Sequence, residues 1–585
     1  MNDARGLAFS ENRIAGSGSH CPDGLGHATF PAIVLIRQGE IREMKTKLYL
    51  AAIAAAALSA CGGGSDSTSS TPSTSNTPTT KIAGTAAVGA ALPNATVQAK
   101  CASGSGTATT ASDGTFTINI ADATRPCVLS VTTPDGTTLH SVVEAGTGTT
   151  AVANITPLTE LITASIAGGS TKTFFDSFDA QAQSKLNNSG VSNAIEAVKV
   201  ILTGTVDLAG MDPLKDTLVA AHGNTPGNAL DQRLDTLGRV LETAKTSIAD
   251  LSAAVGSNSG STAGVTTILQ PASATCASFR SGKYQKVDLT GNTVQRFTVD
   301  AVALTRTNDS TSAVESFPAF AGEACRFSNN DARLLISKSG IGVERRLGAP
   351  SLVIPEQTIP LAELAGDWVA MAFEKETSVS TYGSGLIKFT VDIAGKFTKG
   401  ADCGMNGCSA WAPADLPTVS ANANGGFDAV FSDGTARAFG FKGVDGQLSI
   451  VVIHANGFWM AKRPTPRAMP ALGFTNSYWD VNVNSSGNIG TNGINAFTTK
   501  VISVDTANGL FTRQRAEDGR IDTFKDNMPS VGLRYRPQVQ AIPGGAPGAA
   551  EAITMNLPNT GLSVAISVNP PDPLNHFYSI SVDRP

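Results

Sequence analysis

Six cysteines lie beyond residue 100, and their chemistry sets the first constraint on the chain. They are Cys101, Cys127, Cys276, Cys325, Cys403 and Cys408. An even number of cysteines is typical of disulfide bonding in an exported protein, because the cytosol keeps thiols reduced. The sequence alone leaves the connectivity open, since six cysteines can pair in many ways. The simplest arrangement pairs neighbours along the chain, as Cys101–Cys127, Cys276–Cys325 and Cys403–Cys408.

The last two cysteines also have a spacing that zinc sites use. Only Gly-Met-Asn-Gly separates Cys403 from Cys408. No second pair of cysteines or histidines accompanies them, and a structural zinc ion needs more ligands than these two. Asp-Gly pairs occur in the chain, but none belongs to the repeated-aspartate loop of a calcium site. A local disulfide is therefore favoured, and neither a metal nor another cofactor is predicted.

Catalytic side chains are sparse. Beyond residue 61 the chain has four widely separated histidines, His140, His222, His454 and His576. The sequence contains no metalloprotease motif, serine nucleophile elbow, phosphate loop or dinucleotide fingerprint. Folding could still bring a carboxylate to His454, although a lone histidine in Val-Val-Ile-His-Ala-Asn-Gly is more often an ordinary strand residue. The prediction is a protein without catalytic activity.

A hydrophobic segment near the N-terminus indicates the compartment. A short basic stretch follows Met44, residues 48–58 (LYLAAIAAAAL) are apolar, and small residues lead to Cys61. The apolar run is too short for a membrane-spanning helix, which needs about 20 residues. The sequence Leu-Ser-Ala-Cys at 58–61 resembles the lipobox at the end of the signal peptide of bacterial lipoproteins.

This resemblance implies three features of the mature protein. The signal peptide would be cleaved between Ala60 and Cys61, and Cys61 would carry a diacylglyceryl thioether and an acylated amine. Two or more acyl chains anchor a protein stably to a lipid membrane. Gly62 stands where an aspartate often signals retention in the inner membrane of Gram-negative bacteria, so the outer membrane is expected. Whether the protein faces the periplasm or the cell surface stays open.

The segments around the lipobox carry no fold signal. Residues 1–43 show no periodicity, and we interpret them as an untranslated or disordered upstream extension, with translation beginning at Met44. Residues 44–60 form the predicted signal peptide. Residues 61–80 are rich in Ser, Thr, Gly and Pro and are predicted to be a disordered tether.

The composition suits a modular exported protein. The chain has 585 residues, of which 41% are hydrophobic and 16% charged, and its formal net charge is −5. This length favours several domains, each with its own core. The absence of a basic run gives nucleic-acid binding no electrostatic support. We therefore expect a multidomain, mainly β protein with a helical insert.

The first folded part is expected at 81–155. Apolar and polar residues alternate in 97–101 and in 116–120, and the pairs Asp113-Gly114 and Asp135-Gly136 have the composition of hairpin turns. Short strands with regular turns favour a small β-sandwich.

Three motifs in this part resemble the carboxypeptidase regulatory-like, or transthyretin-like, domain. They are 82–86 (IAGTA), 91–97 (ALPNATV) and 110–116 (TASDGTF). Ala86 replaces the usual valine, and Asn94 stands where glycine is common. The resemblance covers about 75 residues and implies a non-catalytic accessory β-sandwich, with no active-site residue.

Residues 156–256 are predicted to be helical. Thr156 followed by Pro157 is a good helix start, and 193–202 is a second helix candidate. A third helix is expected from Asn228 to Gly256 because apolar residues recur there at helical spacing; they are Leu230, Leu234, Leu237, Leu241, Ile248, Leu251 and Val255. This stripe suits either a coiled-coil seam or, as we favour, an amphipathic helix packed on its neighbours. Residues 257–264 are predicted to be a linker.

Residues 265–585 have the pattern of one or more antiparallel β-domains, either sandwiches or barrels. Strands are predicted at 389–393, 427–431, 436–441, 448–453, 478–483 and 577–582. Turns are predicted at 432–434 and 444–446. Gly366-Asp367-Trp368 weakly resembles the G-x-W start of lipocalins. The triplets 282–284 (GKY) and 477–479 (SYW) have a similar pattern, so the possibility of a degenerate internal repeat stays open. For these aromatic residues, a structural role in filling the base of a β-core is favoured over a role in a ligand site.

Two classes of function remain. The favoured one is a non-catalytic envelope lipoprotein whose β-rich C-terminal part presents a surface for an unknown ligand, protein or glycan, because loops on rigid sheets commonly carry recognition. The alternative is an exported hydrolase that acts on polysaccharide or peptide, with paired carboxylates in an open β-cleft.

Overall fold

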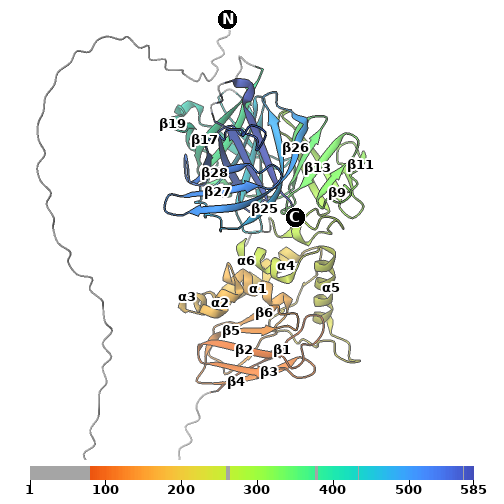
Figure 1. Cartoon of the computed structure of the whole chain (residues 1–585). Helices are drawn as coiled ribbons and strands as arrows, with labels where there is room; N and C mark the ends of the chain where they lie inside the picture. Colours follow the sequence, from red (N-terminus) through yellow and green to blue (C-terminus); the bar gives the residue numbers. More distant parts are fainter. Residues whose placement is uncertain are drawn as a thin grey trace, which may run out of the picture. The chain divides into compact units, whose positions relative to one another are not determined.

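The computed structural model describes residues 79–258, 262, 264–375, 380–432, 434–568, 570 and 572–585. These residues form 32 β-strands and six α-helices (Figure 1). The fold is mainly β with a helical insert and several β-units, as predicted. The predicted signal peptide, Cys61 and nearly all of the tether lie outside the described residues, as do positions 259–261 and 263 of the predicted linker.

The first unit is a β-sandwich of two sheets. One sheet has the order β4-β1-β7 and the other has the order β3-β2-β5-β6. The strands are β1 (Thr79–Thr85), β2 (Thr96–Ser103), β3 (Ser105–Thr109), β4 (Thr115–Ala121), β5 (Thr124–Thr132), β6 (Thr138–Val143) and β7 (Thr150–Val152). The apolar residues of the two predicted alternating runs meet in its core. Alternation thus identified the buried face of each sheet.

The two Asp-Gly turns differ in what they connect. Asp135-Gly136 joins β5 to β6, which pair antiparallel, so the predicted hairpin is confirmed. The hairpin prediction for Asp113-Gly114 is wrong, because this turn joins β3 to β4 and these strands belong to different sheets. An Asp-Gly pair favours a tight turn but does not decide which strand the chain pairs with next.

Six helices follow the sandwich. They are α1 (Pro157–Ala167), α2 (Thr171–Ser177), α3 (Ala180–Lys185), α4 (Asn188–Leu202), α5 (Ala229–Thr243) and α6 (Ile248–Ser257). Thr156 caps α1 and Asn228 caps α5, as predicted. The single long helix predicted from Asn228 to Gly256 is wrong, because Lys245 has a positive φ of 48° and Ser247 starts a new helix with a capping box.

Three antiparallel β-units follow, which we name the first meander, the second meander and the barrel. The first meander consists of β8 (Gly282–Asp288), β9 (Thr293–Asp300), β10 (Thr305–Asn308), β11 (Val314–Ser316), β12 (Arg326–Ser328), β13 (Ala332–Ile336), β14 (Gly342–Arg346) and β15 (Ala349–Pro355). The second consists of β16 (Gly366–Lys375), β17 (Tyr382–Val391), β18 (Phe397–Gly404), β19 (Gly407–Ala410), β20 (Thr418–Ala421), β21 (Phe427–Val430), β22 (Thr435–Lys442), β23 (Leu448–His454) and β24 (Gly457–Lys462). The barrel consists of β25 (Thr475–Asn484), β26 (Ile489–Asp505), β27 (Leu510–Arg515), β28 (Ile521–Asp526), β29 (Leu533–Arg536), β30 (Ala552–Leu557), β31 (Leu562–Ser567) and β32 (Phe577–Asp583).

The same up-and-down topology occurs in all three units. In each, the first strand pairs antiparallel with the last, β8 with β15, β16 with β24 and β25 with β32. Only the barrel closes completely, whereas the other two sheets have free ends. Tyr284, Trp368 and Trp479, the aromatic residues of the three similar triplets, are all buried and all belong to the first strand of their unit. This arrangement favours the structural role predicted for them.

The predicted strands of this region are present with small changes at their ends. Residues 427–431, 436–441, 448–453, 478–483 and 577–582 correspond to β21, β22, β23, β25 and β32. The strand predicted at 389–393 ends at Val391 instead, because Asp392 accepts backbone hydrogen bonds from Ala394 and Lys396 and so starts a turn. Ile393 is therefore exposed.

The three β-units contribute to one hydrophobic core. Phe327 and Leu335 come from the first meander, Met371 and Phe458 from the second, and Trp479 and Tyr578 from the barrel; these residues belong to one buried cluster, which continues through all three units. The outer face of the barrel is apolar in this region because it packs in this cluster. The inner face of the barrel is then free to be polar, since the unit buries its apolar residues outside its lumen.

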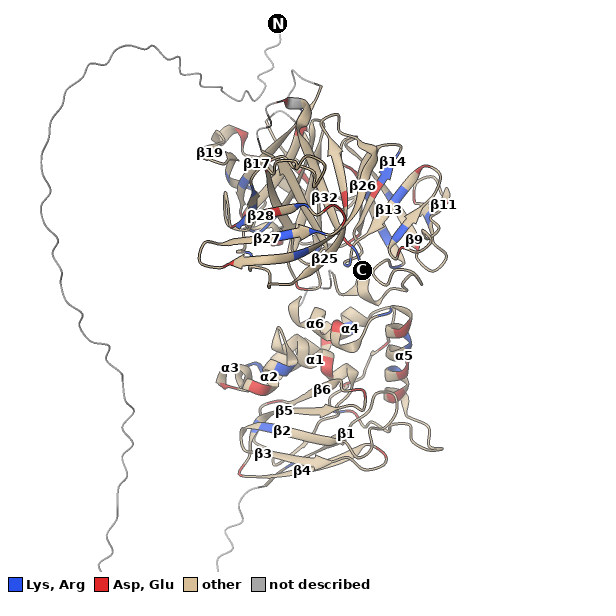
Figure 2. Ribbon diagram, in the orientation of Figure 1, with Lys and Arg blue, Asp and Glu red and all other residues tan. Residues whose placement is uncertain are grey.

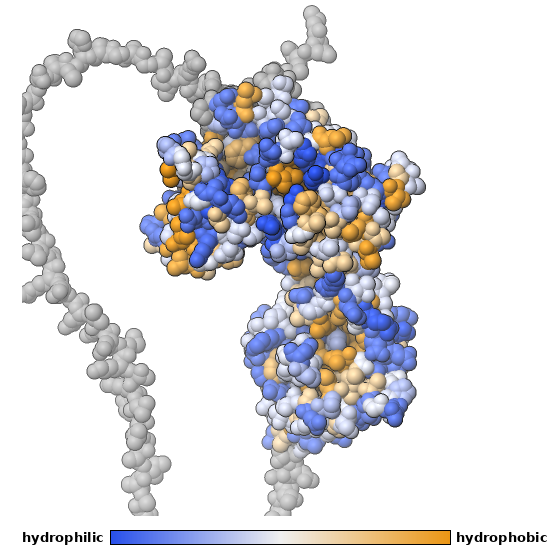
Figure 3. Space-filling model, turned by 45° about the vertical axis from the view of Figure 1, so that its right-hand side comes forward, coloured by the Kyte–Doolittle hydropathy of each residue, from blue (hydrophilic) through white to orange (hydrophobic). Residues whose placement is uncertain are grey.

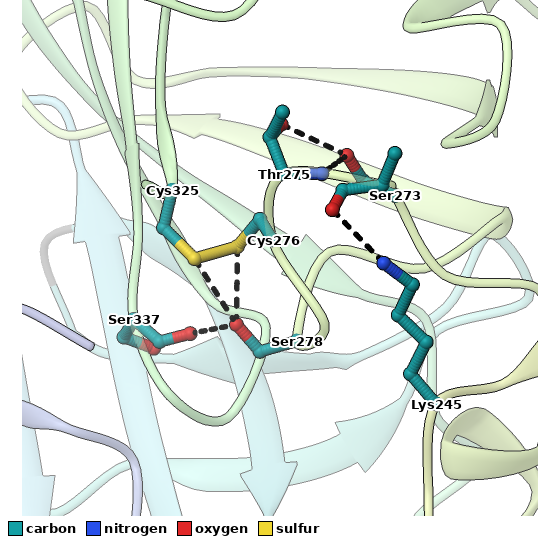
Figure 4. Close-up of a disulfide and its surroundings, with 8 residues drawn as sticks. Lys245, Ser273, Thr275, Cys276, Ser278, Cys325 and Ser337 are labelled. Carbon is teal, nitrogen blue, oxygen red and sulfur yellow. Dashed lines mark hydrogen bonds between the residues drawn. A yellow bond between two sulfur atoms is a disulfide. The ribbon is translucent and has the colours of Figure 1, made fainter. Parts of the chain in front are cut away.

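All six cysteines form disulfides, and each pairs with its neighbour along the chain. The pairs are Cys101–Cys127, Cys276–Cys325 and Cys403–Cys408. Figure 4 shows Cys276–Cys325, where the Ser278 hydroxyl lies near both sulfur atoms and donates a hydrogen bond to the Ser337 carbonyl oxygen at 2.7 Å. Disulfides are typical of proteins outside the cytosol.

The described residues contain no helix long and apolar enough to cross a membrane. On the face of the molecule drawn in Figure 3, hydrophilic and hydrophobic residues are interspersed.

Candidate binding site in the barrel lumen

The candidate site is the lumen of the barrel, which contains a cavity of about 280 Å³. Side chains alternate between lumen and outer face along each strand. On β27 the lumen side carries Phe511, Arg513 and Arg515, and on β29 it carries Arg534 and Arg536. The volume of this cavity is just below the range for pockets that hold drug-sized molecules, which is roughly 300–1,000 Å³. It suits one small molecule.

Six arginines line this cavity. They are Arg467, Arg513, Arg515, Arg520, Arg534 and Arg536. Asp480 is the one carboxylate among the lining residues of the described part of the chain. Two of the six arginines, Arg513 and Arg515, belong to β27, on which basic residues are drawn in blue in Figure 2. Because like charges repel, such a concentration needs compensation by carboxylates, by stacking or by a bound anion.

Three aspartates beside the lumen provide part of this compensation. Asp522 is buried and lies 3.0 Å from Arg520, 3.5 Å from Arg536 and 4.0 Å from Arg513. Arg515 pairs with Asp518, and Arg534 pairs with Asp526. Even so, the six arginines outnumber the four aspartates of the site.

Aromatic rings hold three of the guanidinium groups in place, and one of these is Arg515, which lies 4.0 Å from the ring centre of Phe497. Arg513 lies 4.6 Å from the ring centre of Phe524, and Arg534 lies 4.5 Å from that of Phe511. The two rings stack on each other at 5.2 Å. Stacking of this kind stabilises a cation without neutralising it, so the positive charge remains available to a ligand.

Several donors of the arginines have no partner among the described residues. The Nε atoms of Arg513 and Arg536 are buried without a hydrogen bond. The guanidinium of Arg467 makes no hydrogen bond to any residue that the structure describes; only its backbone N–H donates, to Asn527. Unpaired buried donors are costly, and a carboxylate or phosphate group in the cavity would satisfy them.

Burial lowers the pKa values of Arg467 and Arg536, two of these arginines. Burial, together with repulsion from Arg534, lowers the pKa of Arg467 to about 9. Burial also lowers the pKa of Arg536 to about 10, despite the attraction of Asp522. Both groups stay charged at pH 7, and a bound anion would raise both pKa values again.

The opposite wall of the lumen is polar and uncharged apart from Asp480. It is formed by β25, β31 and β32, which contribute Asn476, Asn482, Ser563, Ser579 and Ser581. Thr554 of β30 also lines the cavity, but it pairs with Arg534 of β29 and so lies beside the arginines. Ser579 and Ser581 donate hydrogen bonds to Asp480. Small residues such as Ala552 and Ala565 lie between these polar groups and leave room for the cavity.

The histidines considered as catalytic candidates lie apart from this lumen lining. His140 is buried and its Nδ1 lies 2.8 Å from Glu160, which also accepts hydrogen bonds from Thr171 and Ser252. This arrangement joins β6, α1, α2 and α6 and has the character of a structural contact. His576 lies beside Ser567 and Ser384, and His222 belongs to a turn.

His454 does have a carboxylate partner. Its Nε2 lies 2.6 Å from Oε1 of Glu374, which also accepts a hydrogen bond from the Trp459 indole. Asp402 is nearby, and burial, with a contribution from Glu374, raises its pKa. None of these four residues lines the barrel cavity, and Glu374 is already engaged by two partners.

The sequence analysis did not single out the arginines of the lumen. A signal was present, because arginines occupy alternate positions at 513 and 515 and again at 534 and 536. Among the described residues, no group of His, Cys, Asp and Glu has the arrangement of a metal site.

No protein family model matches the chain, and neither a curated protein nor a solved structure shows significant similarity to it.

Proposed function

We propose that this protein is a non-catalytic lipoprotein of the bacterial envelope that binds a small anion in the lumen of its C-terminal barrel. The observation that carries the binding role is the set of six arginines around one cavity. Buried guanidinium groups favour carboxylate and phosphate groups, which accept two parallel hydrogen bonds from one arginine.

Other parts of the chain support the proposed location. The lipobox-like sequence that ends at Cys61 provides a lipid anchor, and the three disulfides are typical of an oxidising compartment. We assign the outer membrane because Gly62 follows the cysteine. The small sandwich, which resembles carboxypeptidase regulatory-like domains, would then be an accessory unit between the tether and the binding part.

The anchor is tested with Cys61→Ser. A labelled fatty acid is expected to be incorporated into the wild-type protein in cells and not into the variant, because the acyl chains need the Cys61 thiol and its amine. The variant is also expected to leave the membrane fraction. Incorporation of label into Cys61→Ser would contradict the proposed anchor.

Anion binding is tested by calorimetric titration of the purified mature protein with sulfate and with citrate. Arg467→Gln is expected to weaken binding by at least about tenfold, because a hydrogen bond to a charged group contributes about 1.5–3 kcal/mol. The fold should tolerate this change, since the Arg467 guanidinium has no hydrogen-bond partner among the described residues.

Lys525→Gln is the matched control. It removes the same charge from β28, but Lys525 is exposed and alternates with the lumen residues Phe524 and Asp526. Its titration curve should match that of the wild type. Equal weakening by both variants would show a general charge effect, and no binding of either anion would refute the proposed function.

One arrangement of carboxylates supports the alternative, which is an exported hydrolase. Asp402 with a raised pKa beside Glu374 resembles the pairing of an acid with a base. However, Glu374 is held by His454 and Trp459. We therefore favour the binding role.

A further inference from the structure

The two walls of the lumen differ in chemistry, and this difference restricts the ligand. The arginines of β27 and β29 lie on one side of the closed barrel. In the closed strand order, β25, β31 and β32 lie across the lumen from β28. A ligand in the cavity therefore meets guanidinium groups on one side and hydroxyl and amide groups on the other.

The polar wall has hydrogen-bonding groups that are available to a ligand. The side chains of Asn482 and Ser563 line the cavity and make no hydrogen bond to any residue that the structure describes. Asp480 accepts from Ser579 and Ser581 through one carboxylate oxygen, Oδ1. Its other oxygen can accept from a ligand hydroxyl. Carboxylate, amide and hydroxyl groups in this combination both donate to and accept from alcohol groups.

We infer that the ligand of the barrel is a single acidic sugar, a polyol ring that carries one carboxylate or phosphate group. This inference rests on the proposed anion-binding function and adds the class of ligand. The acidic group would lie against the arginines, and the ring hydroxyls would lie against Asn482, Ser563 and Asp480. The cavity of about 280 Å³ suits one sugar unit.

The arginine wall favours one acidic group over several. Asp522, Asp518 and Asp526 already compensate part of the charge, so the excess is small. Arg467 and the free Nε atoms of Arg513 and Arg536 provide the unsatisfied donors. One carboxylate or phosphate group has enough acceptor oxygens to bind several of these donors.

Four probes test the inference on the full mature protein by calorimetry. Glucuronate carries both hydroxyls and a carboxylate, and glucose 6-phosphate carries hydroxyls and a phosphate. Glucose lacks the charge, and cyclohexanecarboxylate lacks the hydroxyls. At least one acidic sugar is expected to bind about tenfold or more tightly than both glucose and cyclohexanecarboxylate. The tighter of the two acidic sugars identifies the acidic group.

The outcomes separate the inference from the proposed function. If cyclohexanecarboxylate binds as tightly as both acidic sugars, the hydroxyl wall is not used and the inference is wrong, while anion binding stands. If glucose binds as tightly as the acidic sugars, both the inference and the proposed anion-binding function are wrong. The same conclusion follows if no probe and no inorganic anion binds.

Two variants test the hydroxyl wall directly. Ser563→Ala removes a hydroxyl from the lumen, and Asn482→Ala removes an amide. Each is expected to weaken binding of the acidic sugar about fivefold and to leave cyclohexanecarboxylate unchanged. Thr523→Val is the control, because Thr523 alternates with the lumen residues of β28 and bonds to Thr512. Unchanged acidic-sugar affinity in both lumen variants would overturn the inference.

Discussion

Glu344→Ala is expected to lower the free energy of unfolding of the β-region by about 3–5 kcal/mol, the range for breaking a buried ion pair. Glu344 is fully buried in the first meander. It lies 2.9 Å from Lys286, 2.6 Å from Arg306 and 2.9 Å from Arg346. Removing this one carboxylate leaves three cations close together, with only Glu315 to compensate the two arginines.

The measurement is urea unfolding followed by tryptophan fluorescence. All four tryptophans, Trp368, Trp411, Trp459 and Trp479, lie in the second meander and the barrel. The three units share one core, so damage to the first meander should shift this transition. Glu356→Ala is the control, because Glu356 pairs with the exposed Arg296; its effect should stay below about 1 kcal/mol. An equal effect of both variants would contradict a special role of Glu344.

The same carboxylate gives the stability a pH dependence. Burial alone would raise the pKa of Glu344, but Arg306 and Lys286 outweigh burial and hold the pKa at about 2, against an ordinary value of 4.5. The folded state therefore binds this proton less readily than the unfolded state. The stabilisation is present above about pH 4.5 and disappears as the pH falls towards 2. Wild type and Glu344→Ala should thus converge in stability over this range.

Local patterns predicted the elements of the fold, but they did not predict which side chains of the barrel strands lie in the lumen. The alternation in 97–101 and 116–120 correctly identified the buried side of the sandwich, and Thr156 and Asn228 correctly marked helix starts. The helix break at Lys245 was missed because Leu241 and Ile248 are seven residues apart, a spacing that also suits one continuous helix. The capping box of Ser247 and Asp250 was the local signal for the break.

The binding site could not be located in the same way. In an antiparallel sheet with one buried face, alternating charged residues are expected to face solvent. By that rule Arg513, Arg515, Arg534 and Arg536 belong on the outside of the barrel. Arg534 and Arg536 lie in the lumen because the alternate residue Leu533 packs in the core shared with both meanders. On β27, Arg513 and Arg515 share the lumen side with Phe511, which packs against Phe524. This reversal depends on contacts between units far apart in the sequence, which strand periodicity does not contain.

Asp522→Ala is the second change with a large expected effect, and its effect should depend on anions. Asp522 is buried and compensates Arg513, Arg520 and Arg536. Its removal should destabilise the barrel by about 3–5 kcal/mol in a buffer without multivalent anions. Asp505→Ala, which removes an exposed carboxylate at the end of β26, should leave the stability close to that of the wild type.

Sulfate should restore part of the stability that Asp522→Ala loses. An anion that binds only the folded state adds about 2.7 kcal/mol at a concentration 100 times its Kd. The variant should gain more from sulfate than the wild type does, because its lumen has one more uncompensated positive charge. Sodium chloride at equal ionic strength separates binding from screening, since screening weakens the repulsion in any salt. Equal rescue by both salts would mean that the arginines repel one another without forming an anion site, whereas rescue by sulfate alone would show that the lumen binds the anion in place of the missing carboxylate.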